Sequence, residues 1–231
     1  MATPTALFQQ AFDAELQNLI DQGHDPANFH AAGKRATKSN PNPTGEDYFW
    51  WRREGPEMMQ RWVDWRKAAK WQIWTTPDNR PAIELELDTH VAGRPIRAIL
   101  DRIMVIPTTG HLCLVDVKSG KRTPESDLQL AVYRYCVTST WPEVDINYGG
   151  YWMARKGDMV TVSLARFTEQ MIVSWYDRFI KAREAGIYIP HMSSTCKACS
   201  LREFCAAYGG SKSHLDPDSP QYQPEEEGAQ K

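Results

Sequence analysis

The sequence has no apolar run that approaches the roughly 20 residues needed for a membrane-spanning helix. Its first residues, MATPTALFQQ, lack the basic segment followed by an apolar stretch that is typical of a secretory signal. Cysteine is scarce: the chain has five, and the first is Cys113. An odd number of cysteines argues against a disulfide framework. We therefore expect no membrane association, a cytoplasmic location and thiols that serve as ligands.

Strong net charge is absent as well, since the formal net charge of the 231-residue chain is −2. An apolar content of 42% is enough for a sizeable core and excludes a disordered chain. Acidic residues gather near the C-terminus among glycine, serine and proline, a composition that favours disorder. We expect an N-terminal helix and loop over 1–45, one folded domain over 46–208, and a disordered acidic tail over 209–231.

The apolar pattern predicts helices and strands in a mixed order. The predicted helices cover about 5–22, 56–72, 123–138 and 168–185, and Pro56 is expected in the first turn of the second helix. Short β-rich segments predict a meander of three strands over about 83–87, 97–105 and 112–118, and a hairpin over about 148–154 and 159–164. We expect an α/β fold with a central mixed sheet flanked by helices.

Two acids and a lysine fall on neighbouring predicted strands. Asp101 interrupts an apolar run, while Asp116 and Lys118 are two residues apart and so share a strand face. If the strands pair through a turn at 107–110, a register that aligns Asp101 with Asp116 brings the three side chains together. Carboxylate oxygens suit Mg²⁺ or Mn²⁺, and a lysine can stabilise charge on a phosphate. The alternative is a surface ion pair beside an edge charge.

Gln129 and Tyr133 lie four residues apart on the following predicted helix and share one of its faces. The ordered set of Asp101, Asp116-Val117-Lys118 and Gln129-x-x-x-Tyr133 resembles the PD-(D/E)XK nuclease superfamily, specifically its RecB-like exonuclease branch. The resemblance covers about residues 55–205 and implies a restriction-endonuclease-like core.

The resemblance also implies roles for these residues. Asp101, Asp116 and the carbonyl of Val117 would bind the divalent metal, and Lys118 would serve the attacking water. The glutamine and the tyrosine of the helix would contact the DNA strand beside the scissile phosphate. Helix packing is the alternative for those two.

The family usually has a histidine or glutamate on a helix ahead of the strands, as a further metal ligand. Glu57 is the nearest metal-capable residue here. A solvent-facing acid in a first helical turn is the alternative. Glu84 and Glu86 on the preceding strand are further candidates, with structural roles as their alternative.

Cys196, Cys199 and Cys205 form a C-x2-C-x5-C pattern after the last predicted helix. A C-x-x-C hook presents two thiolates to one metal, and a third can close from a short turn. Three free buried cysteines are the alternative. The pattern resembles the C-terminal part of the iron–sulfur staple in RecB-like and CRISPR-associated exonucleases. That resemblance implies a [4Fe-4S] cluster, with Zn²⁺ as the other open choice.

The fourth ligand of such a cluster is missing, because this chain has no cysteine in the upstream region where those relatives have theirs. A histidine, either His191 or His30, is expected to complete the site. The two remaining thiols, Cys113 and Cys136, are expected to pack in the core.

Six of the nine tryptophans fall within residues 50–74, interleaved with basic residues. Such a pattern is typical of single-strand-binding surfaces, although most of these tryptophans are expected in the core. Trp50 and Trp51 are consecutive and cannot both face inward on one regular element. One of them is expected to contact DNA.

We expect a hydrolase, a Mg²⁺- or Mn²⁺-dependent DNA exonuclease that attacks phosphodiesters in line with water, at DNA ends or on single strands. A stand-alone nuclease without a helicase motif suits phage or mobile-element recombination, in which case it would act in the host cytoplasm; a recombination or helicase partner is left open. The alternative is a non-catalytic DNA-binding or adaptor protein that keeps the fold. A zinc-ribbon interaction module is a third hypothesis.

Overall fold

The computed structural model describes residues 3–26, 46–187, 192–193, 196, 199 and 201–210. The chain forms two compact units, Met1–Asp177 and Arg178–Lys231. No helix in the described part of the chain is long and apolar enough to cross a membrane. The tail expected beyond residue 210 lies outside the described residues.

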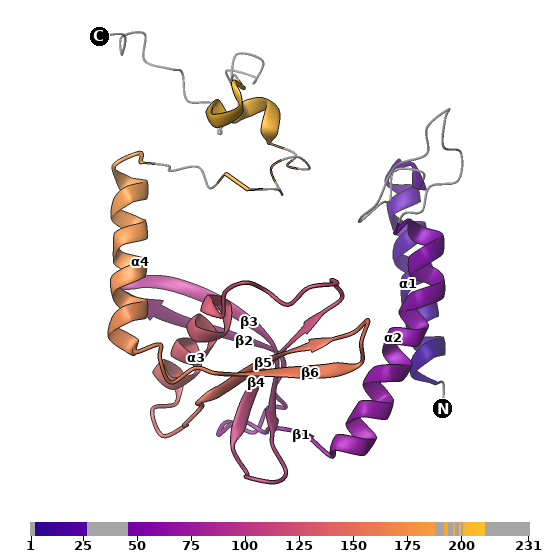
Figure 1. Ribbon diagram of the computed structural model, residues 1–231, viewed down its shortest axis with the longest axis horizontal. Coiled ribbons are helices and arrows are strands. Elements are labelled where there is room, and N and C mark those ends of the chain that lie inside the picture. The colour runs from indigo at the N-terminus through magenta and orange to yellow at the C-terminus, as the bar shows by residue number, and fades with distance from the viewer. Residues whose placement is uncertain are drawn as a thin grey trace. The chain divides into compact units, whose positions relative to one another are not determined.

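The first unit is built on one six-stranded mixed sheet (Figure 1). Its strands are β1 (Gln72–Ile73), β2 (Ile83–Val91), β3 (Arg94–Val105), β4 (Leu112–Lys118), β5 (Tyr148–Met153) and β6 (Asp158–Ser163). Strands β2, β3 and β4 form the expected antiparallel meander. Helix α3 (Leu128–Thr140) then returns the chain so that β5 pairs parallel with β4, and β6 closes a hairpin with β5. The predicted α/β fold with a central mixed sheet is confirmed.

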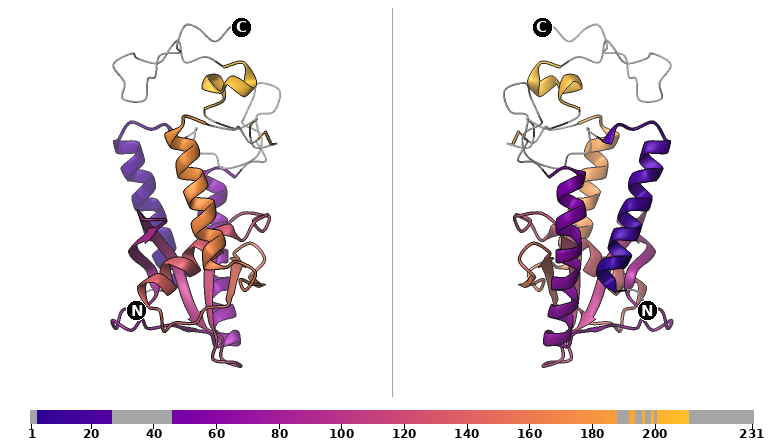
Figure 2. Two further views of the ribbon diagram at one scale, coloured as in Figure 1. Left: turned by 90° about the vertical axis from the view of Figure 1, so that its left-hand side faces the viewer. Right: turned by 90° about the vertical axis from the view of Figure 1, so that its right-hand side faces the viewer.

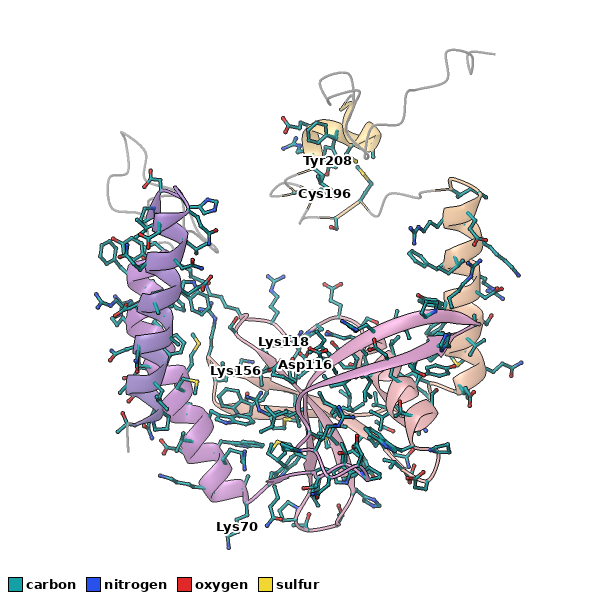
Figure 3. All side chains as sticks on the ribbon, turned by 180° about the vertical axis from the view of Figure 1, so that it is seen from behind. Lys70, Asp116, Lys118, Lys156, Cys196 and Tyr208 are labelled. Carbon is teal, nitrogen blue, oxygen red and sulfur yellow. The ribbon has the colours of Figure 1, made fainter. Side chains whose placement is uncertain are left out.

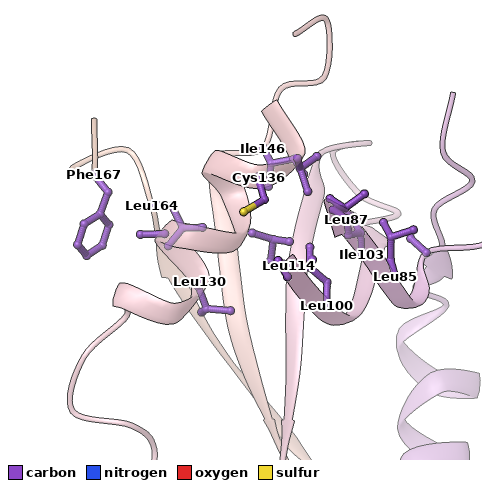
Figure 4. Packing of buried hydrophobic residues seen from close by; sticks show 14 of the residues in the cluster. Leu85, Leu87, Leu100, Ile103, Leu114, Leu130, Cys136, Ile146, Leu164 and Phe167 are labelled. Carbon is purple, nitrogen blue, oxygen red and sulfur yellow. The ribbon is translucent and has the colours of Figure 1, made fainter. Parts of the chain in front are cut away.

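The sheet buries apolar side chains on both faces, because alternate residues of a strand point to opposite sides. On the face covered by α3, Leu114 packs with Leu130 and Cys136 (Figure 4). On the other face, Cys113 packs with Val115 and with aromatic side chains of α2 (Tyr48–Ala69). Both cysteines are fully buried, as expected, and burial raises the pKa of Cys113 to about 12 and that of Cys136 to about 11.

Helix α2 begins eight residues before Pro56, so the prediction that Pro56 opens it is wrong. The carboxylate of Asp47 caps the true start by accepting from the Trp50 amide at 2.8 Å. Pro56 lies in the helix interior, where it removes one backbone hydrogen bond. Helix α1 (Pro4–Asp21) runs alongside α2 in the opposite direction (Figure 2), and its Phe8 ring meets Gly55. The contact between α1 and α2 stabilises α2 at the position where Pro56 removes a hydrogen bond.

Trp50 and Trp51 are both half-buried and both pack against the α2 side of the sheet, where the sequence predicted only one of them. The contact of one of them with DNA stays a prediction. Consecutive helical residues are separated by about 100°, and indole rings are large enough to span that angle. The two rings meet edge to face, with centroids 4.9 Å apart. The Arg155 guanidinium lies over both.

Helix α3 begins at Leu128 and not near Thr123. The Tyr151 hydroxyl donates to the Ser126 carbonyl at 3.2 Å, and the Asp127 carbonyl accepts from Ala131 at 3.0 Å. The chain is therefore fixed just ahead of the helix, and residues 119–127 form a loop after β4. Helix α4 (Glu169–Glu184) agrees with its prediction.

Gly150 in β5 has no room for a side chain. A Cβ atom there would lie 2.6 Å from the Val160 carbonyl oxygen and 3.2 Å from the Thr161 Cα, both backbone atoms of β6. We expect Gly150→Ala to lower the free energy of unfolding by about 1–3 kcal/mol, measured by urea denaturation. Gly120→Ala is the matched control, since its nearest atom would be 3.9 Å away. Equal stabilities of the two variants would contradict this packing.

Candidate active site

Strands β3 and β4 bring Asp101 and Asp116 to the same level of the sheet. Their register pairs Arg102 with Val115, and one further step sets Asp101 opposite Asp116. At this step the Val117 amide donates to the Asp101 Oδ2 atom at 2.8 Å. A side-chain carboxylate thus takes the place of a backbone acceptor, which fixes Asp101 against β4.

Asp116 is a buried carboxylate paired with Lys118. The residue is 3% exposed. The Lys118 Nζ atom forms an ion pair with the Asp116 Oδ2 atom at 2.7 Å (Figure 3). Burial raises the pKa of Asp116, and the charge of Asp101 adds to that rise, while Lys118 opposes it. The ionised form is therefore costly here, and a bound cation would relieve that cost.

A short polar chain runs from the lysine to helix α3. The Lys118 Nζ donates to the Gln129 Oε1 at 3.4 Å, and the Gln129 Nε2 donates to the Tyr133 hydroxyl at 2.9 Å. The helical spacing of four residues puts the glutamine and the tyrosine on one face, as expected. Four of the residues singled out from the sequence are thus joined: Asp116, Lys118, Gln129 and Tyr133.

If the site cleaves DNA, as the sequence resemblance implies, Gln129→Ala should lower kcat about tenfold, because the lysine loses the hydrogen bond that orients it. Steady-state kinetics on a DNA substrate would measure this loss. Gln60→Ala is a matched control, since Gln60 donates along its own helix to Asp64, away from the two carboxylates. An unchanged kcat in Gln129→Ala would show that the glutamine does not position Lys118.

Glu84, the second residue of β2, adopts a left-handed backbone conformation with φ of 46°. The register that pairs Ile83 with Arg102 and Leu85 with Leu100 sets it opposite Asp101. Such a conformation costs about 1–3 kcal/mol for a residue other than glycine, and it persists only where the surroundings impose it. The strand is therefore strained beside the first carboxylate.

Glu57 and Glu86, the other acids considered as ligands, are exposed on α2 and on β2. Within the described ranges, no group of three or more His, Cys, Asp or Glu side chains is arranged to hold a metal ion. Among the described residues, the structure thus brings two carboxylates together and adds no third to them. The hard oxygens of Asp101 and of the buried Asp116 nevertheless fit Mg²⁺ or Mn²⁺.

The cysteine pattern lies in the second unit. The Cys199 amide donates to the Cys196 carbonyl at 3.3 Å, and Cys205 accepts backbone bonds from Tyr208 and Gly210. Hydrogen bonds from Ser193, the largest effect, and from Tyr208 lower the pKa of the Cys196 thiol. These three thiols form no ligand group in the described residues, and His191 and His30 lie outside those residues.

A charged network beside the site was not predicted from the sequence. The Arg155 Nη2 atom donates to the Glu46 Oε2 at 2.6 Å, and its Nε donates to the Ser119 carbonyl at 2.6 Å. The Lys121 Nζ atom lies 3.1 Å from the other Glu46 oxygen. The first pair joins residues 109 positions apart, so no local pattern could reveal it.

The family model of the PD-(D/E)XK nuclease superfamily matches residues 4–206. The chain therefore belongs to this superfamily, which puts it among nucleases. It is similar to the Gene 69 protein of Mycobacterium phage D29, with 26% identity over 210 residues that cover 82% of this chain and 76% of the relative. The Gene 69 protein of Mycobacterium phage L5 is 26% identical over 179 residues, or 67% of this chain and 61% of the relative. Among solved structures, that of SSO0001 matches with a TM-score of 0.40 and 13% identity, covering 87% of this chain and 81% of that one.

Proposed function

We propose that the protein is a Mg²⁺- or Mn²⁺-dependent DNA exonuclease of the RecB-like branch. The observation that carries this proposal is the buried Asp116 carboxylate, which lies beside Lys118 and opposite Asp101. Burial and the neighbouring charge of Asp101 make the ionised form of Asp116 costly, and a bound cation would relieve that cost. Membership of the nuclease superfamily supports the same chemistry.

In this proposal Asp101 and Asp116, with the Val117 carbonyl, hold the divalent cation. When bound, the cation would polarise the scissile phosphate and favour deprotonation of water. Lys118 orients the attacking water and stabilises the charge that develops on the phosphoryl oxygens. Gln129 keeps the lysine directed at the site through the 3.4 Å contact.

Gln129 and Tyr133 are proposed to contact the DNA strand beside the scissile phosphate. Gln129 is exposed and Tyr133 half-buried, so both can reach a ligand on the α3 side of the sheet. The two similar proteins come from phages, and membership of the nuclease superfamily supports chemistry on nucleic acid. We therefore propose a role in phage DNA processing. In that setting the protein would act in the host cytoplasm.

The test uses end-labelled linear DNA, single- and double-stranded, beside covalently closed circular DNA. An exonuclease requires an end, so the purified protein should degrade linear DNA with Mg²⁺ or Mn²⁺ and leave the circle intact. Cleavage of the circle at an equal rate would make the enzyme an endonuclease. Binding of DNA without any metal-dependent cleavage would favour the non-catalytic adaptor.

We propose further that Cys196, Cys199 and Cys205 bind a structural metal, either a [4Fe-4S] cluster or Zn²⁺. The lowered pKa of Cys196 supports a thiolate there. Anaerobically purified protein with an iron–sulfur cluster should be coloured, with an absorption band in the visible blue, and Cys199→Ser should remove that band. If the bound metal is zinc, metal analysis should find zinc in a colourless protein. Purified protein that contains neither iron nor zinc would contradict the proposal.

A further inference from the structure

A pocket of about 500 Å³ opens to solvent directly after the proposed catalytic lysine. It is lined by Glu46, Trp51, Ser119, Gly120, Lys121, Arg122 and Arg155. Its volume is within the roughly 300–1,000 Å³ typical of ligand sites. The pocket draws on three parts of the chain: the start of α2, the loop after β4 and the turn after β5.

The pocket lies where ligands bind in sheets of this kind. Strands β4 and β5 are parallel, so Lys118 and Met153, which pair, end them at the same edge. The Ala154 amide donates to the Lys118 carbonyl at 2.9 Å and ties the two strand ends together. The crevice beyond the carboxyl ends of parallel strands is the usual ligand site of α/β folds.

The Arg155 side chain lines the pocket and is held in one orientation by its hydrogen bonds. Its guanidinium donates to the Ser119 carbonyl and to the carboxylate of Glu46, which is only 8% exposed. The guanidinium carbon also lies 5.6 Å from the centroid of the Trp51 ring. The indole is thus held beside the loop that follows the catalytic strand, and little ordering is needed when a ligand enters.

The net positive charge of the residues that line the pocket favours binding of an anion. Lys121, Arg122 and Arg155 bring three cations against the single carboxylate of Glu46. The Lys121 side chain is 73% exposed, so its pair with Glu46 is weak and the ammonium is free to turn toward a phosphate. A cation beside an aromatic ring is the pairing by which proteins hold single-stranded nucleic acid.

We infer that this pocket binds one nucleotide of the substrate strand next to the scissile phosphate, with Trp51 stacking on the base and Lys121 holding the phosphate. Arg155 and Glu46 position these two groups. The inference rests on the proposed function, since the ligand is the strand that the active site would cut.

The test measures binding of a fluorescent single-stranded oligodeoxynucleotide in EDTA, where no cleavage occurs. Trp51→Ala should weaken binding roughly 5- to 100-fold, while Trp51→Phe should retain most of the affinity. Lys121→Ala should lower the slope of log affinity against log salt by about 0.7, the change for one phosphate contact on a single strand. Lys121 is exposed, so this variant tests the pocket even if Trp51→Ala fails to fold.

An abasic site moved along the oligonucleotide locates the stacked base. Wild type should lose affinity when the abasic site reaches one position, and Trp51→Phe should lose it at the same position. Trp175→Ala and Lys67→Ala are matched controls at exposed residues outside the pocket, and both should bind as wild type does.

The inference is overturned if Lys121→Ala keeps the wild-type affinity and salt slope, or if no abasic position weakens binding. These failures are distinct from failure of the proposed function. If the pocket variants weaken binding but wild type shows no metal-dependent cleavage, only the proposed nuclease activity is contradicted. If wild type cleaves DNA and the pocket variants bind as tightly as wild type, only the role of the pocket is contradicted.

Discussion

Lys118→Ala is expected to lower the rate of metal-dependent DNA cleavage by about 10²–10⁴-fold, the range for loss of a group that acts on the transferred proton or the developing charge. The Nζ atom is 2.7 Å from Asp116 Oδ2 and 3.4 Å from Gln129 Oε1, so both contacts direct it into the site. Single-turnover cleavage of a labelled oligonucleotide would measure the chemical step.

Removal of the lysine also leaves Asp116 without its cation, which could unfold the chain. Lys118→Arg is the second variant, because it keeps the charge but spreads it over a planar group that cannot occupy the same point. It should fold and still lose about 10²-fold or more in rate. Lys67→Ala, at an exposed position on α2, removes the same charge and should cleave as wild type does. Wild-type rates in both Lys118 variants would remove the lysine from the mechanism.

Asp116→Asn should abolish cleavage and at the same time stabilise the metal-free protein. The pKa of this carboxyl is raised by burial and by Asp101, so its ionised form opposes folding. A neutral amide removes that cost, and we expect a rise in Tm of about 2–4 °C, equivalent to about 1 kcal/mol for a chain of this size. Thermal denaturation at pH 7 in EDTA would measure it.

The direction of the pKa shift of Asp116 determines how the Tm difference between Asp116→Asn and wild type depends on pH. Because the folded-state pKa of Asp116 is raised, the cost of its charge is present above that pKa and is lost as pH falls through it. The Tm advantage of Asp116→Asn should therefore shrink as the pH is lowered. Mg²⁺ should raise the Tm of wild type only. Asp64→Asn, at an exposed acid, should change neither property. A lower Tm for Asp116→Asn at pH 7 would mean that the ion pair with Lys118 stabilises the fold.

Much of the sheet could be predicted from the sequence, because its strands alternate or run apolar between clear turns. Strand β4 has the predicted bounds, and pairing of β3 with β4 follows from their short connection. The start of α2 could not be predicted, since Pro56 normally opens a helix. Here the Asp47 cap and the packing of α1 extend the helix across the proline.

The sequence predicted the parts of the candidate site whose residues are close to one another along the chain. Asp116 and Lys118 share a strand face, and Gln129 and Tyr133 share a helix face, so local periodicity is enough to pair them. The left-handed conformation of Glu84 and the contact of Arg155 with Glu46 could not be predicted, because both depend on tertiary packing. The proposed strand-binding pocket is built from such distant contacts, and the sequence indicated only that Trp50 or Trp51 faces DNA.

The central claim is that Asp101 and Asp116 hold the divalent cation on which phosphodiester cleavage depends. Its most direct test is the cleavage rate of one linear DNA by wild type, Asp101→Asn and Asp116→Asn over increasing Mn²⁺. We predict a rate that saturates with Mn²⁺ in wild type and vanishes in EDTA. Both variants should show no cleavage at any Mn²⁺ concentration. Cleavage by either variant at the wild-type rate, or cleavage by wild type that persists in EDTA, would contradict it.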